Sequence, residues 1–128
     1  MATTRHVELR PTSTAPTQAR GELRRLVAPG DPPWLGDAEL VVSELVANAV
    51  EHGDGTLSVF LEVDHDRVRI AVTTGATDAV PAVLDVGPDA PHGRGLRIVS
   101  AVAQHWGHEV RGGRRTVWAV LVESGAER

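Results

Sequence analysis

The stretch Asp37–Gly53, DAELVVSELVANAVEHG, decides how the rest of the chain is interpreted. At about 100° per residue, it places one wide apolar arc toward a core, made by Val42, Leu45, Val46, Ala49 and Val50. Glu44 and Asn48 lie one helical turn apart, so their side chains meet on another face, and His52 continues that stripe. The pattern predicts one long amphipathic helix. Its polar stripe fits either a solvated face or one wall of a binding site.

The composition limits the class of protein. The chain has 128 residues, of which 41% are hydrophobic, and this fits a single packed domain over residues 1–128. It has no cysteine, no run of ~18 apolar residues and no apolar leader, so we expect no disulfide, no membrane span and a cytoplasmic location. The formal net charge of −4 at pH 7 argues against non-specific nucleic-acid binding as the main activity.

Hydrophobic periodicity predicts the element order β-α-α-β-β-loop-α-β-β. The expected strands cover residues 6–11, 56–63, 67–72, 108–111 and 115–122, and the expected helices cover 14–27, 37–53 and 95–106. Short turns at 64–66 and 112–113 should close antiparallel hairpins, which would leave the helices on one face of a sheet. The expected fold class is α+β: a two-layer sandwich of a mixed, mainly antiparallel sheet with helices on one face.

A segment rich in Gly and Pro, residues 73–92, interrupts this order. A stretch of that length without periodicity is usually a functional lid or a disordered segment. It leads into Gly93-Arg94-Gly95, where the next expected helix opens, and uncovered backbone N–H groups at a helix start favour an anion such as phosphate. The alternative is that these glycines serve only a tight turn, because the pattern is neither a P-loop nor a dinucleotide fingerprint.

Glu44 and Asn48 carry the chemistry that a phosphate site would use. The amide oxygen of Asn48 suits a hard cation such as Mg²⁺, whose octahedron phosphates and waters would complete. Glu44 could accept a proton from an attacking hydroxyl or water. His52 is interpreted first as a packing or hydrogen-bonding residue at the helix end and second as a nucleotide contact. Together with a glycine cradle and a lid, these residues indicate a phosphoryl-transfer site.

Three motifs together resemble those of the histidine-kinase-like ATPase superfamily, and more narrowly its small anti-sigma-factor serine kinases of Gram-positive and actinobacterial regulation. Residues 44–53 (ELVANAVEHG) resemble the N-box, and residues 93–107 (GRGLRIVSAVAQHWG) are similar to the second glycine box with its helix. Residues 113–118 (GRRTVW) resemble the terminal strand. The resemblance runs from about Glu8 to Leu121 and implies a sandwich that binds ATP and Mg²⁺ between the long helix and the lid.

The resemblance also implies roles for individual residues. Asn48 would hold Mg²⁺, Glu44 would act as the base or position a water, and Thr116 would lie near the adenine. The second glycine box would cradle the phosphates through Gly93, Arg94, Gly95 and Leu96. The implied partners are a sigma factor and an anti-anti-sigma protein whose serine is phosphorylated, with a homodimer as the family tendency and no direct contact with nucleic acid or membrane.

The first glycine box departs from the family pattern. In the family, a strand-end Asp followed shortly by Gly accepts a hydrogen bond from the adenine amino group, whereas here Thr74 precedes Gly75. The Thr74 hydroxyl can accept a hydrogen bond, but it lacks the negative charge and the length of an Asp side chain. Loss of the charge-assisted hydrogen bond to adenine would cost on the order of 1.5–3 kcal/mol, or roughly ten- to a hundredfold in affinity. Asp78 could take this place only through a rearrangement of the loop.

Three functions compete. The first is an ATP-binding anti-sigma factor and serine kinase that regulates transcription, which the polar stripe and the glycine cradle favour. The second is a binding protein of the same fold that sequesters a regulatory partner with little or no nucleotide affinity, which Thr74 favours. The third is a DNA-binding regulator that uses Arg111, Arg114 and Arg115, although arginines beside a hairpin turn are more simply a solvated hairpin.

Overall fold

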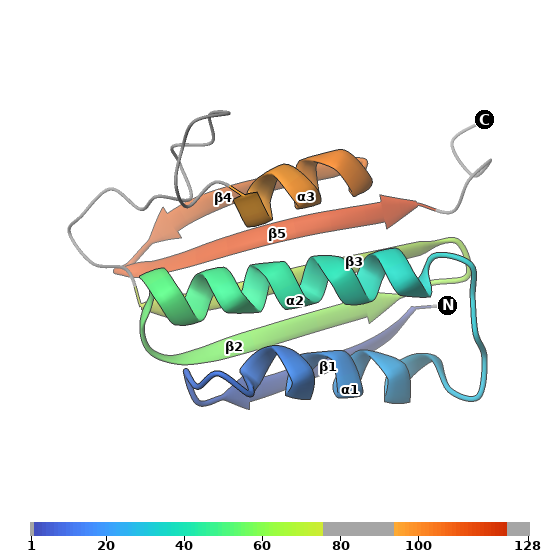
Figure 1. Ribbon diagram of the computed structural model, residues 1–128, viewed down its shortest axis with the longest axis horizontal. Coiled ribbons are helices and arrows are strands. Elements are labelled where there is room, and N and C mark those ends of the chain that lie inside the picture. Colours follow the sequence, from blue (N-terminus) through green and yellow to red (C-terminus); the bar gives the residue numbers. More distant parts are fainter. Residues whose placement is uncertain (1, 76–93, 123–128) are drawn as a thin grey trace.

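The computed structural model describes residues 2–75 and 94–122, with side chains described at 2–75 and 97–122. The strands are β1 (Thr3–Leu9), β2 (Asp54–Val63), β3 (Arg67–Gly75), β4 (His105–Arg111) and β5 (Arg114–Val122). The helices are α1 (Ala15–Val27), α2 (Leu35–His52) and α3 (Arg94–Val102). Figure 1 shows the three helices in one layer over one face of the sheet.

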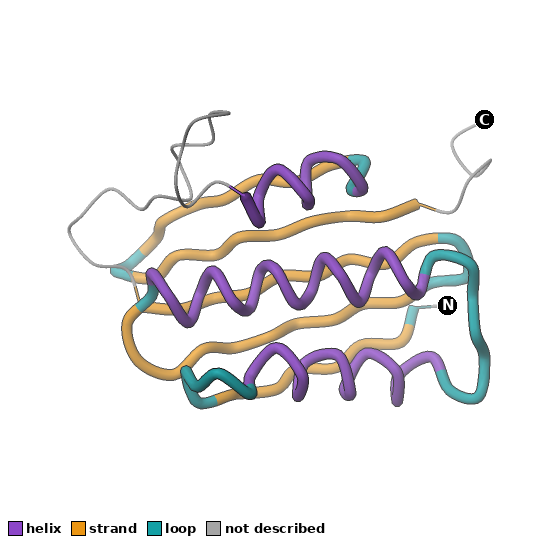
Figure 2. Tube along the Cα trace, viewed as in Figure 1, coloured by secondary structure: helices purple, strands orange, loops and turns teal. Residues whose placement is uncertain are grey.

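The strands form one sheet in the order β1-β2-β3-β5-β4. Each neighbouring pair is antiparallel, so the sheet is not mixed within the described residues. In the described part of the chain, no helix covers the other face of the sheet, as the trace in Figure 2 shows. The predicted two-layer α+β fold is confirmed. None of the described helices is long and apolar enough to cross a bilayer.

The core lies between the helices and the inner face of the sheet. On α2, the predicted arc is buried at Val42, Leu45 and Val46, each at most 1% exposed. The strands contribute every second residue, as period-two alternation requires. These buried strand residues include Leu57, Val59 and Leu61 of β2 and Val68, Ile70 and Val72 of β3. Removal of this apolar surface from water is the main force that holds the helix layer on the sheet.

α2 begins two residues earlier than predicted. Trp34 is its N-cap residue, and both Trp34 and Leu35 are buried, so the hydrophobic contact fixes the start of the helix without a side-chain cap. The helix ends at His52, and Gly53 alone separates it from β2. This short connection places the end of α2 directly above the sheet.

The predicted helix over residues 95–106 is wrong at its C-terminal end. α3 ends at Val102, and β4 begins at His105. The backbone N–H of Gln104 donates to the carbonyl of Val120 (2.9 Å), and Trp106 packs against the core from a strand. The pairing with β5 therefore overrides the helical periodicity of this segment.

Candidate functional site

A small cavity lies where the C-terminal end of α2 packs over β3 and β5. Its polar lining residues are Asn48, His52, Thr74 and Arg115, and its other lining residues are Leu45, Ala49, Gly53, Val72 and Val117. The cavity volume is about 10 Å³, which is room for about one water molecule. The fold therefore brings two predicted residues of α2 to the predicted strand-end threonine.

The α2 side of the cavity carries the polar stripe predicted from sequence. Asn48 and His52 are half-buried and line the cavity one turn apart. Glu44, a further turn back, is also half-buried but does not line it. The His52 side chain is 18% exposed, and its Nε2 lies 3.8 Å from Oε2 of Glu51. Of the three stripe residues, Asn48 and His52 thus line the cavity and Glu44 does not.

Thr74 forms part of the floor of the cavity and is 3% exposed. Its hydroxyl donates to the backbone carbonyl of Asp54 at 3.3 Å, which leaves the oxygen lone pairs free to accept. A Cβ at Gly53 would lie 2.4 Å from the Thr74 side chain, and a Cβ at Gly75 would lie 2.6 Å from the Asp54 carbonyl oxygen. These two glycines therefore permit the close approach of the helix end to the end of β3.

Arg115 occupies the floor beside Thr74, its cross-strand partner on β5. It is 3% exposed, and its Nε has no hydrogen-bond partner in the part of the chain that the structure describes. Burial away from water lowers the pKa of the Arg115 guanidinium below its usual value. Sequence reasoning treated this residue as a solvated hairpin arginine. Alternation from Val117 and Leu121, both inward, could have identified it.

Thr116 does not join this cavity. It follows Arg115 on β5, so its side chain points to the opposite face of the sheet. There its Oγ1 lies 2.8 Å from Oγ1 of Thr73, in a hydrogen bond between hydroxyls. Thr116 therefore lies on the face of the sheet opposite to α2, where it cannot make the expected contact with an adenine bound under α2. Arg115 takes the inward position instead.

The second glycine box is only partly described. Gly93 lies outside the described residues, as does most of the expected lid, from residue 76 onward. The expected start of the lid is wrong, because residues 73–75 belong to β3. Residues 94–96, Arg94, Gly95 and Leu96, form the first turn of α3, and their side chains lie outside the described part. Figure 1 shows that α3 lies alongside α2 and runs in the opposite direction. The start of α3, with its uncovered N–H groups, therefore faces the same end of the molecule as the end of α2.

The described residues can be tested for a metal site. No group of three or more His, Asp or Glu side chains gathers around a common point in residues 2–75 and 97–122. A cation at this site would therefore depend on ligands from a bound nucleotide and water. The Asn48 amide, half-buried at the cavity, fits that role, since Mg²⁺ typically takes one or two protein oxygens and completes its octahedron with phosphates and waters.

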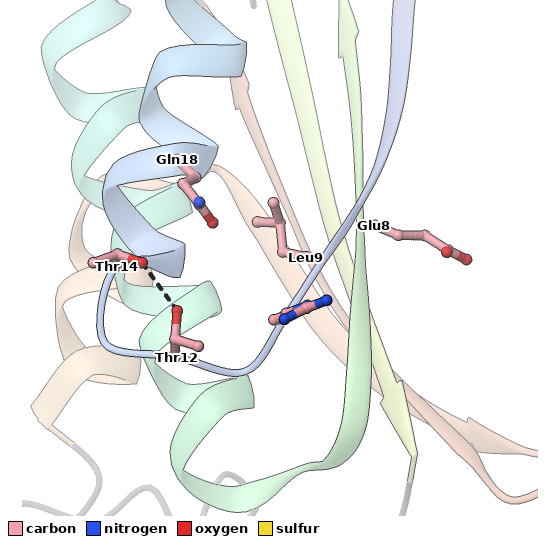
Figure 3. Close-up of a pocket in the computed structure, with 6 residues that line it drawn as sticks. Glu8, Leu9, Thr12, Thr14 and Gln18 are labelled. Atoms are coloured by element: carbon pink, nitrogen blue, oxygen red, sulfur yellow. Dashed lines mark hydrogen bonds between the residues drawn. The ribbon is translucent and has the colours of Figure 1, made fainter.

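A second cavity, of about 420 Å³, lies at the edge of the sheet between the end of β1 and the start of α1. Its lining residues are Glu8, Leu9, Arg10, Thr12, Thr14 and Gln18. In Figure 3 the hydroxyls of Thr12 and Thr14 point toward each other, 3.0 Å apart. All of these residues except Leu9 are exposed, and none belongs to the predicted site. The volume of this second cavity therefore reflects an open surface groove and does not indicate a functional site.

Comparisons with known proteins agree with this arrangement. A sequence profile of the histidine kinase-like ATPase domain matches residues 7–121. The chain is also similar to the crystal structure of the RsbU and RsbW domains of Rv1364c from Mycobacterium tuberculosis, with a TM-score of 0.69 and 23% identity. That likeness covers 94% of this chain and 32% of the other, and it shows the fold. No curated protein sequence matches the chain. The profile match extends over most of its length, and the chain belongs to the histidine kinase-like ATPase domain family.

Proposed function

We propose that this protein is a nucleotide-binding regulator of the anti-sigma type, with ATP and Mg²⁺ as the ligands that the family implies. It would transfer a phosphoryl group to a serine of an anti-anti-sigma partner. The observation that carries the proposal is the position of Asn48, which lines one cavity together with the strand-end Thr74. A nucleotide site in this family requires an amide that ligates Mg²⁺, for which we propose Asn48. It also requires a strand end that contacts the base, for which we propose Thr74.

The roles proposed for the residues follow from their places. Asn48 would hold Mg²⁺, which when bound neutralises charge on the phosphates. Glu44, one turn toward the start of α2, would accept the proton of the attacking hydroxyl or position a water. His52, Thr74 and Gly75 would form the base end. The phosphates would lie at the start of α3, at Gly93, Arg94, Gly95 and Leu96.

A second candidate function has its own observation. The cavity has room for about one water molecule, and a buried arginine forms part of its floor. This geometry favours a protein of the same fold that sequesters a regulatory partner and binds nucleotide weakly or not at all. A DNA-binding role is disfavoured, because Arg115 is buried and only Arg111 and Arg114 of the hairpin arginines are exposed.

The wider setting is part of the same proposal. We propose one domain over residues 1–128 that acts in the cytoplasm, binds a sigma factor and/or an anti-anti-sigma protein, and forms a homodimer without direct contact with DNA or membrane. The family membership of the chain supports the regulator class. The structure that it resembles contains RsbU and RsbW domains, which supports the choice of this branch of the family.

Calorimetric titration of the full chain separates the two candidates. With Mg²⁺ in excess, ATP and GTP are titrated in parallel into the protein, and inorganic tripolyphosphate serves as the base-free ligand. Saturable binding of a nucleoside triphosphate supports the proposed function. Absence of binding up to millimolar concentration of each ligand contradicts it and favours the sequestering protein.

A further inference from the structure

The floor of the cavity places a hydrogen-bond donor, Arg115, beside the position at which the family offers an acceptor. Thr74 stands in place of the acidic residue, and its cross-strand partner is Arg115. Arg115 lines the cavity, is 3% exposed, and leaves its Nε without a hydrogen-bond partner in the described part of the chain. Burial of a polar group without a partner is unfavourable, so this guanidinium is poised to gain from a ligand that accepts hydrogen bonds.

A purine ring can enter this cavity only if a side chain moves, because its volume of about 10 Å³ holds about one water molecule. Of the lining residues, Arg115 has the longest side chain. Thr74 is fixed by its hydrogen bond to the Asp54 carbonyl and by contact with Gly53. An incoming base would therefore have to displace the Arg115 guanidinium, which could then donate to the edge of the base.

We propose that this site binds an oxo-purine nucleotide, one of guanine or hypoxanthine, more tightly than an adenine nucleotide, with Arg115 as the residue that determines specificity. The inference rests on the proposed function, namely that a purine nucleotide binds between α2 and the strand floor. Guanine and hypoxanthine carry acceptors at O6 and N7, the pair to which an arginine fork donates two hydrogen bonds. Adenine has an amino donor at position 6, facing a guanidinium that can only donate.

Thr74 completes the match. Its hydroxyl hydrogen is donated to the carbonyl of Asp54, so its oxygen is available as an acceptor. The N1–H of guanine or hypoxanthine is a donor, whereas N1 of adenine is an acceptor. The floor thus pairs one acceptor, Thr74, with one donor, Arg115. These two groups match N1–H and O6 of an oxo-purine, whereas adenine has an acceptor at N1 and a donor at its 6-amino group.

The test compares GTP, ITP and ATP by calorimetry on the full chain, with Mg²⁺ in excess and tripolyphosphate as the base-free probe. We expect Kd for GTP and ITP to be at least about tenfold lower than for ATP. Arg115→Met keeps the apolar stem and removes the fork, so the ratio should fall to about twofold or less, with tripolyphosphate affinity unchanged. The matched control is Arg69→Met, on the outer face of β3, which should keep the wild-type ratio.

The outcomes separate this inference from the function on which it rests. If ATP binds as tightly as GTP or ITP to the wild type, the base preference is refuted and the proposed function stands. If the preference persists in Arg115→Met, Arg115 does not determine it, and the inference is refuted while the proposed function stands. If no nucleotide and no tripolyphosphate binds, both are refuted. If Arg115→Met does not fold, by its circular dichroism, Arg115→Lys takes its place: it keeps the charge but not the fork, and its ratio must fall below the wild-type value.

Discussion

The two sides of the cavity relate differently to the family. The α2 side keeps Glu44, Asn48 and His52 at helical spacing, whereas the strand side has Thr74 and Arg115 where an acidic base reader is expected. The same core supports both sides, although the stripe residues of α2 are half-buried and Thr74 and Arg115 are buried. The difference teaches that the two sides of the cavity belong to separate elements, so the sequence can change one and keep the other.

The largest effect should come from the α2 side. Glu44→Ala removes the proposed proton acceptor, so phosphoryl transfer or phosphate release should fall by about 10²–10⁴-fold. Nucleotide affinity should change little, because Glu44 does not line the cavity. Phosphate release and calorimetry measure the two quantities. Glu62→Ala, on the outer face of β2, is the control, and a parallel loss of binding and transfer in Glu44→Ala would contradict the assigned role.

The strand side should respond to restoration of the acid. In an Arg115→Met background, Thr74→Asp should tighten ATP binding by about ten- to a hundredfold, through a charge-assisted bond to the adenine amino group. Thr74→Asp alone should give a smaller gain, because the new carboxylate would pair with Arg115 across the strands. Calorimetry on the four proteins of this cycle yields the coupling. An unchanged ATP affinity in the double variant would mean that Thr74 is not at the base-reading position.

The junction between the two sides can be broken at Gly53. Gly53→Ala places a Cβ 2.4 Å from the Thr74 side chain and 2.6 Å from the Ala49 carbonyl oxygen, so the helix end and β3 must move apart. We expect the free energy of unfolding to fall by about 2 kcal/mol. Denaturant unfolding measures it. Gly21→Ala, in α1 with nothing within 4 Å of the new Cβ, is the contrast and should raise stability by about 0.5–1 kcal/mol.

The smallest effect should come from the outer face of the same strand. Thr116→Val removes the hydroxyl bonded to Thr73, at a cost of about 1 kcal/mol in stability. Nucleotide affinity should change by less than about twofold, because the side chain points away from α2. Calorimetry beside an unfolding curve measures both. A tenfold loss of affinity would place Thr116 back at the base and would reverse the face assignment of β5.

Much of the fold follows from sequence periodicity. The arc on α2 and the hairpins closed at residues 64–66 and 112–113 are where the patterns predict them, since side-chain burial drives both. The end of the third predicted helix was missed, because residues 104–106 have helical spacing but gain more from pairing with β5. No local pattern records such a long-range pairing.

The site was less accessible from sequence than the fold. Asn48 and His52 line one cavity together, as their spacing predicts, because helical spacing alone sets which residues share a face. The choice between Arg115 and Thr116 depends on strand register, and a shift of one residue exchanges the two faces. The motif resemblance favoured Thr116, while the burial of Val117 and Leu121 requires Arg115 inward.

The single-residue link at Gly53 has a consequence for motion. α2 and β2 meet there with no loop between them, and the space above Gly53 is filled by Thr74, so no hinge exists at this corner. Hinge motion needs a few residues that can absorb a change in backbone angles. We therefore expect the end of α2 and the start of β2 to move together. Adjustment on this side of the site is left to side-chain rotamers, which exchange within nanoseconds when they are exposed and more slowly when they are packed.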